Sequence, residues 1–194
     1  MNSYIKKIEK YAHENNIPIM LSDGIDYMCH YIEKNNIINI LEIGTAIGYS
    51  AIKMALVKDN IKVTTIERDK ERYDIAINNI KKFGLDNRIK VIYADALDVE
   101  LDDIYDLIFI DASKGGSIKF FNKFKDNLSD NGTIITDNLS FHGLVDNPSL
   151  AITKNQKGLV KRINNFIDFL NSNKEFVTKY IEVGDRISIS KKIS

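Results

Sequence analysis

Oxygen-bearing side chains follow two apolar runs of the sequence, at the points where buried strands would end. Asp137 and Asn138 come directly after the run 133–136, and Asp111 comes directly after the run 107–110. The carboxyl ends of the strands in an open parallel sheet form its ligand crevice. Carboxylate and amide oxygens suit a hard divalent cation. These three residues therefore predict a Mg²⁺ site, although a single Asp at a strand end is more often a turn former.

Lys114 is a candidate general base beside this set, because it lies one turn from Asp111. A nearby cation favours the neutral form of a lysine, which is the form that accepts a proton. An exposed loop lysine is the alternative interpretation. The three histidines, His13, His30 and His142, are scattered and have no zinc-binding spacing, so a zinc site is not expected.

A turn with two glycines follows an earlier apolar run. Gly44 and Gly48 stand between the run 37–43 and a helical period, where glycines let the backbone pass close to a ligand. The spacing is not that of a dinucleotide-binding G-x-G-x-x-G motif. Glu67 ends the next apolar run, where an acid is placed to bind ribose hydroxyls. Asp95, after the third run, could line an adenine pocket, with a simple turn role almost as good an interpretation. The pattern predicts a nucleoside site beside the metal site.

The composition excludes several classes of protein. The 27 basic and 27 acidic residues cancel, so the overall charge does not favour nucleic acid or anionic membranes, although the basic run 154–162 could still meet phosphates. Cys29 is the only cysteine, which rules out an internal disulfide framework and a cysteine-based zinc cluster. No apolar run approaches the roughly 20 residues of a membrane-spanning helix, and no signal-peptide pattern is present. A cytoplasmic location is expected.

Short apolar runs alternate with helical periods along the sequence, which predicts a single α/β domain over residues 1–194. The run 105–110 has no polar alternation, which is typical of a strand buried on both faces. Gly184-Asp185 predicts a tight hairpin between the last two strands. The expected strands are 37–43, 61–66, 89–93, 105–110, 133–136, 176–183 and 186–190; the expected helices are 3–15, 23–35, 49–57, 70–83, 117–128 and 158–172.

These motifs together resemble the class I S-adenosylmethionine-dependent methyltransferases, and among them the cation-dependent O-methyltransferases that include the catechol and caffeoyl-coenzyme A enzymes. The resemblance implies a Rossmann-like α/β fold, with a seven-stranded, mostly parallel sheet, one antiparallel strand and helices on both faces. The N-terminal helices, within residues 1–35, would cover the cofactor site. The segments that carry the resemblance are LEIGTAIGYSA (41–51), TIERD (65–69), ADA (94–96), FIDASK (109–114) and TIITDN (133–138).

The resemblance also implies roles for individual residues. S-adenosylmethionine and Mg²⁺ are the implied cofactors. Asp111 would contact both of them, and Asp137 and Asn138 would complete the protein ligands of the metal. Lys114 matches the lysine proposed as the base in catechol-type members. The implied cofactor-site residues are Met20, Glu42, Gly44, Ser50, Glu67 and Ala96, in addition to Asp111.

Within the family the sequence is most similar to the bacterial tRNA 5-hydroxyuridine methyltransferases, in segments 15–20, 41–52, 143–145 and 183–192. This similarity implies that the partner is tRNA, that the product is 5-methoxyuridine at the wobble position, and that the enzyme forms a homodimer. A small catechol-like acceptor is the main alternative. A cofactor-binding protein without catalysis and an NAD-dependent dehydrogenase are weaker ones, the second because of the glycine spacing.

Overall fold

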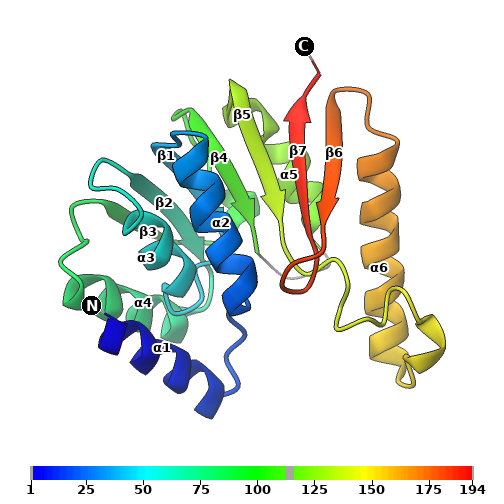
Figure 1. Ribbon diagram of the computed structural model, residues 1–194, viewed down its shortest axis with the longest axis horizontal. Helices are drawn as coiled ribbons and strands as arrows, with labels where there is room; N and C mark the ends of the chain where they lie inside the picture. The colour runs from blue at the N-terminus through cyan, green and yellow to red at the C-terminus, as the bar shows by residue number, and fades with distance from the viewer. Residues whose placement is uncertain (1, 112–115, 194) are drawn as a thin grey trace.

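A single seven-stranded sheet forms the centre of the molecule (Figure 1). The computed structural model describes residues 2–111 and 116–193. The strand order is β3-β2-β1-β4-β5-β7-β6, and within the described residues β7 alone runs in the direction opposite to the other strands. The predicted sheet, mostly parallel with one antiparallel strand, is confirmed. The strands are β1 (Asn39–Ile43), β2 (Lys62–Glu67), β3 (Ile89–Tyr93), β4 (Tyr105–Ile110), β5 (Leu128–Thr136), β6 (Phe176–Ile181) and β7 (Ile187–Lys192).

Helices cover both faces of the sheet because its central strands are apolar on both faces. In β4, Leu107 and Phe109 join the core shared with α2 and α3, whereas Ile108 and Ile110 join the core shared with α5 and α6. This alternation follows from the two-residue period of a strand. Figure 1 shows α2 in front of the sheet and α5 behind it. The α-helices are α1 (Asn2–Glu14), α2 (Ser22–Lys34), α3 (Tyr49–Ala55), α4 (Lys70–Lys82), α5 (Ser117–Phe124) and α6 (Lys154–Asn171), and the 3₁₀ helices are η1 (Ala96–Asp98), η2 (Lys125–Asn127) and η3 (Pro148–Leu150).

The start of β5 differs from the prediction. The strand begins at Leu128 rather than at Thr133, and residues 130–132, which the sequence predicts as a turn, lie within it. The pairing with β4 changes register in this stretch, from Tyr105 opposite Leu128 to Leu107 opposite Thr133. The turn-forming residues therefore produce an irregularity inside the strand instead of ending it.

Helix α6 also begins earlier than predicted, at Lys154 rather than at Gly158. Thr153 Oγ1 accepts a hydrogen bond from the backbone N–H of Gln156 at 3.1 Å, and Gln156 Oε1 accepts one from the N–H of Thr153 at 3.0 Å. This capping box stabilises a first turn that the apolar periodicity does not mark. In the described part of the chain, neither α6 nor any other helix is long and apolar enough to cross a membrane.

Candidate active site

Four neighbouring strands end at one level of the sheet. The strands β2, β1, β4 and β5 are parallel and paired in register up to their last residues. The residue at or just after each strand end therefore lies beside the corresponding residue of the next strand. These residues are Glu67 at the end of β2, Gly44 after β1, Asp111 after β4 and Asp137 after β5. The strand register thus brings the predicted nucleoside and metal residues together.

The strand ends open into a cleft of about 520 Å³. This volume is within the usual range for small-molecule sites in proteins. Pro18, Ile19 and Leu21, from the segment between α1 and α2, also line the cleft. Seven residues considered for the site line it as well: Gly44, Glu67, Asp95, Ala96, Asp111, Asp137 and Asn138.

The predicted metal ligands lie close together at the ends of β4 and β5. Asn138 Nδ2 donates a hydrogen bond to Asp111 Oδ1 at 2.9 Å. The backbone N–H of Asp111 donates to Ile43 at 3.0 Å, and that of Asp137 donates to Ile110 at 3.3 Å, so the main chain fixes both acids at the sheet edge. Asp137 is buried, with 7% of its surface exposed. The arrangement places two carboxylates and an amide group on one part of the cleft wall.

These donors fit a hard cation by their chemistry, because all of them are oxygens. Among the described residues, no group of three or more His, Cys, Asp or Glu side chains could hold a metal ion. The candidate set of Asp111, Asp137 and Asn138 contains two such acids, and the third donor is an amide. A cation with few protein ligands keeps room for water and for substrate oxygens, as Mg²⁺ usually does.

The glycine turn is held by Glu67. Gly44 has φ 104° and Gly48 has φ 83°, values that suit glycine and take the chain sharply from β1 into α3. Glu67 Oε2 accepts a hydrogen bond from the N–H of Ala46 at 2.8 Å, and Oε1 accepts one from the N–H of Asp69 at 2.8 Å. An ionised carboxylate can accept about four hydrogen bonds. Glu67 can therefore hold the turn and still accept hydrogen bonds from a ligand.

The family model for O-methyltransferases matches residues 2–193. The chain belongs to the O-methyltransferase family. This O-methyltransferase depends on S-adenosylmethionine and transfers a methyl group to a hydroxyl. Among curated relatives, a caffeoyl-CoA O-methyltransferase of Medicago sativa is 29% identical to it over 198 residues, which cover 93% of this chain and 77% of the relative.

Solved structures agree with this assignment. The methyltransferase is 35% identical to a Staphylococcus aureus protein solved as a "putative caffeoyl-CoA O-methyltransferase", with a TM-score of 0.93 and coverage of 97% of this chain and 92% of that one. An O-methyltransferase from Bacillus cereus in complex with SAH has the same fold, with 23% identity, a TM-score of 0.82 and coverage of 98% and 91%.

Two residues predicted for the cofactor site, Glu42 and Ser50, are buried and do not line the cleft, so their contact with the cofactor stays a prediction. Glu42 is fully buried in β1 and accepts hydrogen bonds from Ser50 Oγ and, at 2.6 Å, from Thr65 Oγ1. Burial raises the pKa of Glu42 to about 7, and the charge of Glu67 acts in the same direction, while the bonds from Ser50 and Thr65 oppose it. In this structure the side chain of Glu42 therefore links β1 to α3 and β2 through hydrogen bonds.

Met20 also lies outside the cleft lining of the methyltransferase. It is buried, with 4% of its surface exposed, and belongs to the core formed with α2 and α3. Its neighbours Ile19 and Leu21 line the cleft instead. A contact between Met20 and the cofactor remains a prediction from the family resemblance.

The structure adds cleft residues that sequence reasoning missed, among them Arg72, Phe120, His142 and Asp185. The sequence suggested only a hairpin turn for Asp185 and a scattered position for His142. In the structure, Asp185 Oδ1 accepts a hydrogen bond from the backbone N–H of His142 at 2.6 Å, and the backbone oxygen of Asp185 accepts one from the N–H of Ser140 at 2.8 Å. The likeness of segment 183–185 to relatives was the signal available in the sequence.

The turn between β6 and β7 forms hydrogen bonds with two other parts of the chain. The N–H of Gly184 donates to Asp23 Oδ2, at the start of α2, over 3.0 Å. On the other side, Arg186 forms a bidentate pair with Asp146 at 3.0 and 2.9 Å. Paired, planar contacts of this kind fix geometry as well as charge. The turn thus joins the N-terminal helices to the loop that follows Asn138.

The predicted general base, Lys114, lies outside the described residues, within 112–115. Gly116 and Ser117 resume the chain at the start of α5. The role of Lys114 stays a prediction. Cys29 is partly buried, and burial raises the pKa of its thiol to about 11, which disfavours the nucleophilic thiolate.

Proposed function

We propose that this methyltransferase acts on 5-hydroxyuridine at the wobble position of tRNA and produces 5-methoxyuridine. The polarity of the cleft around the candidate metal ligands supports this acceptor, since His142 and Asp185 line it together with Asp111, Asp137 and Asn138. Apolar residues, among them Leu21 and Phe120, line the same cleft and would suit the ring of either candidate acceptor. A nucleotide that belongs to an RNA can obtain affinity from contacts elsewhere on the same molecule.

S-adenosylmethionine would occupy the part of the cleft at the carboxyl ends of β1, β2 and β3. Gly44 allows close approach of the backbone, and Glu67 would accept hydrogen bonds from the ribose hydroxyls. Asp95 and Ala96, which line the cleft after β3, would border the adenine. Asp111 stands between this part and the acceptor part, because β4 lies between β1 and β5.

Mg²⁺ would be held by Asp111, Asp137 and Asn138. A bound Mg²⁺ supplies a Lewis acid that lowers the pKa of the acceptor hydroxyl and orients it. The chain's own contribution is to hold these donors in place, through the backbone hydrogen bonds of both acids and the contact between Asn138 and Asp111.

The transfer itself requires alignment more than activation, because the sulfonium methyl group is intrinsically reactive. The acceptor oxygen forms a bond to the methyl carbon while the carbon–sulfur bond breaks. The electron pair of the broken carbon–sulfur bond stays on sulfur, which becomes a neutral thioether. The hydroxyl proton passes to a base, for which we propose Lys114. Holding acceptor and donor in line within one cleft removes most of the entropic cost of the reaction.

A small catechol-like molecule is the second candidate acceptor. The names of the curated relatives favour it, since they include caffeoyl-CoA O-methyltransferases. A catechol and 5-hydroxyuridine both present two neighbouring oxygens, so either would suit the same set of oxygen ligands. The choice between them depends on where the rest of the acceptor binds.

The test measures labelled methyl transfer from S-adenosylmethionine to tRNA from cells that lack the enzyme, with catechol assayed in parallel. We expect labelling of tRNA with Mg²⁺, loss of labelling with EDTA, and recovery with excess Mg²⁺. Mass spectrometry of the nucleosides should then identify 5-methoxyuridine. Labelling of catechol without any labelling of tRNA would favour the second candidate, and full activity in EDTA would remove the metal from the proposal.

We also propose that the enzyme forms a homodimer in the cytoplasm, where tRNA is available. Light scattering of the purified protein measures the oligomeric state directly. A monomer at micromolar concentration would rule out the dimer without affecting the proposed reaction.

A further inference from the structure

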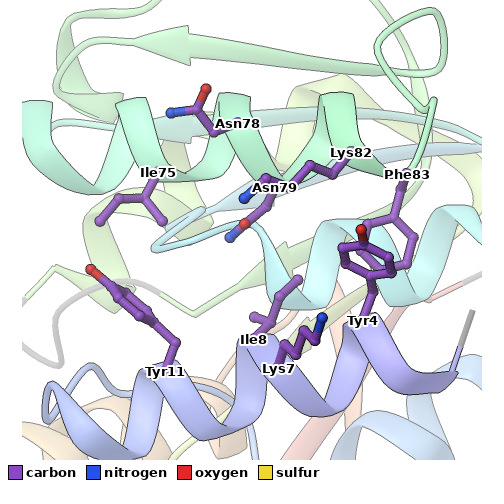
Figure 2. A pocket seen from close by; sticks show the side chains of 9 residues that line it. All are labelled: Tyr4, Lys7, Ile8, Tyr11, Ile75, Asn78, Asn79, Lys82 and Phe83. Atoms are coloured by element: carbon purple, nitrogen blue, oxygen red, sulfur yellow. The ribbon is translucent and has the colours of Figure 1, made fainter.

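A second cavity of about 350 Å³ lies between α1 and α4, and it shares no lining residue with the cofactor cleft. Figure 2 shows Tyr4 and Tyr11 near its two ends, with Lys7 and Ile8 between them on α1 and with residues of α4 facing them. We call this cavity the α1–α4 groove. Its volume is within the range of sites that hold small organic groups.

The groove offers flat apolar surfaces to a ligand. Tyr4 and Tyr11 are seven positions apart in α1, so they lie on one face of the helix. They remain 47% and 40% exposed, although both are large aromatic residues. Ile8 and Ile75 provide apolar surface between the helices, as Figure 2 shows. Aromatic side chains exposed in this way can stack against a planar ring.

The charge of the groove suits an anion. Lys7 and Lys82 are its charged lining residues, and no carboxylate lines it among the residues that the structure describes. Lys7 Nζ lies 4.9 Å from the centre of the Tyr4 ring. Asn78 and Asn79 add amides that can donate and accept hydrogen bonds. Rings for stacking, amides for a base edge and lysines for phosphate together match a nucleotide of an RNA chain.

The groove and the cofactor cleft are built on the same segments. On α4, Arg72 lines the cleft and Ile75, about one turn later, lines the groove. Asn79, which also lines the groove, donates from Nδ2 to the backbone oxygen of Ile47 in the glycine turn over 2.9 Å. The chain that leaves α1 continues directly into the segment 18–21 at the cleft. The groove therefore lies next to the part of the cleft that is lined by Arg72 and the segment 18–21.

We propose that the α1–α4 groove binds a second nucleotide of the RNA whose modified nucleotide enters the cleft. The inference rests on the proposed function, because it assigns the tRNA a further contact. The base stacks on Tyr11, because the ring of Tyr4 already faces Lys7 and Phe83, and the phosphate lies near Lys7 and Lys82. Affinity gained here adds to the affinity of the contacts that the acceptor makes in the cleft.

The experiment compares variants for tRNA affinity, for the KM and kcat of tRNA methylation, and for the affinity of S-adenosylhomocysteine. Tyr11→Ala should weaken tRNA binding about 5- to 100-fold, the range for loss of one stacking contact, and Tyr11→Phe should retain it. A Lys7→Ala/Lys82→Ala double variant should raise the KM for tRNA and reduce its salt dependence. S-adenosylhomocysteine should bind all of these variants with unchanged affinity, which also shows that they are folded.

The matched control is Lys6→Ala/Lys10→Ala, which removes the same charge from exposed positions that do not line the groove. Equal tRNA affinity in both double variants, or a normal KM for tRNA in Tyr11→Ala, would overturn the inference while leaving the proposed function intact. Wild-type enzyme that neither binds nor methylates tRNA would instead refute the proposed function and remove the ligand assigned to the groove. Conversion of a dimer to a monomer by Tyr11→Ala would identify the groove as a contact between two copies and would also overturn the inference.

Discussion

Asn138 Nδ2 and Asp111 Oδ1 are joined by a hydrogen bond of 2.9 Å between the ends of two adjacent strands. The main chain at Asn138 has an unusual conformation, with φ 69° in the left-handed region. Asn and Gly adopt this left-handed region much more readily than other residues do. An asparagine at position 138 therefore suits the backbone conformation and also supplies the amide that contacts Asp111.

Asp137→Ala should lower the rate of methyl transfer by at least about 100-fold, because a bound metal contributes several kcal/mol to stabilising the transition state. The affinity for S-adenosylhomocysteine should change little, since Asp137 lies at the end of β5, away from the nucleoside part of the cleft. Kinetics and calorimetry on the same sample measure both quantities. The control is Asp130→Ala, an exposed acid near the other end of β5. Full turnover in Asp137→Ala would contradict the assigned metal role.

Glu67→Gln should weaken S-adenosylhomocysteine binding by about 10- to 100-fold, the usual value of one or two hydrogen bonds to a charged group. The carboxylate accepts from the N–H groups of Ala46 and Asp69, and an amide would turn a donor toward one of them. Calorimetry measures the change. Glu71→Gln, which alters an exposed acid in the first turn of α4, is the control. Equal affinities for the two variants would show that Glu67 does not hold the cofactor turn.

Glu42 should make the stability of the fold depend on pH. Its pKa rises from the ordinary value of 4.5 to about 7 in the folded protein, mainly because of burial. The folded state therefore binds more protons than the unfolded state between these values, so the free energy of unfolding should fall as pH rises from about 4.5 to 7. The contribution lost is at most about 3 kcal/mol.

Chemical denaturation of wild type and Glu42→Gln at pH 5 and pH 8 tests this prediction. The neutral amide can accept a hydrogen bond from Ser50 and donate one to Thr65. The hydroxyl of Thr65 can then donate to the hydroxyl of Thr45, which lies 2.6 Å away. The free energy of unfolding of Glu42→Gln relative to wild type should thus be higher at pH 8 than at pH 5. A difference that is the same at both values would show that Glu42 does not titrate in this range.

Asp185→Ala should destabilise the loop after Asn138 and slow methylation without weakening cofactor binding. The variant leaves the N–H of His142 without its buried acceptor, a loss of about 1–3 kcal/mol. Limited proteolysis should cut the region 139–147 faster, and calorimetry should give a normal affinity for S-adenosylhomocysteine. Asp98→Ala, a change of the same type in η1, provides the comparison. Wild-type proteolysis and turnover in Asp185→Ala would contradict the assigned role.

The part of the site that the sequence could predict lies at strand ends. Gly44, Glu67, Asp111 and Asp137 were identifiable because each ends or follows an apolar run, and parallel register then brings them to one level. Strands β3 and β4 have the predicted bounds for the same reason, since their apolar runs are short and clearly delimited.

The residues that could not be predicted depend on loop geometry. His142 reaches the cleft through a stretch in which Phe141 and His142 have φ 50° and 55°, and its partner Asp185 is 43 positions away. No periodicity records such a contact. For Glu42 and Ser50, family resemblance predicts a contact with the cofactor, and the structure shows only that both are buried and do not line the cleft. Their distance from the cofactor depends on side-chain directions that the sequence pattern leaves open.

The hydrogen bond between Gly184 and Asp23 has a consequence for how the enzyme is made. It joins positions 161 residues apart, so the ribosome releases the start of α2 long before the turn that binds it. A nascent chain that ends after β5 already carries Gly44, Asp111 and Asp137 but not Asp185. Asp185 joins the lining of the cleft only after β6 has been synthesised, so we expect no methylation before the β6–β7 hairpin is complete.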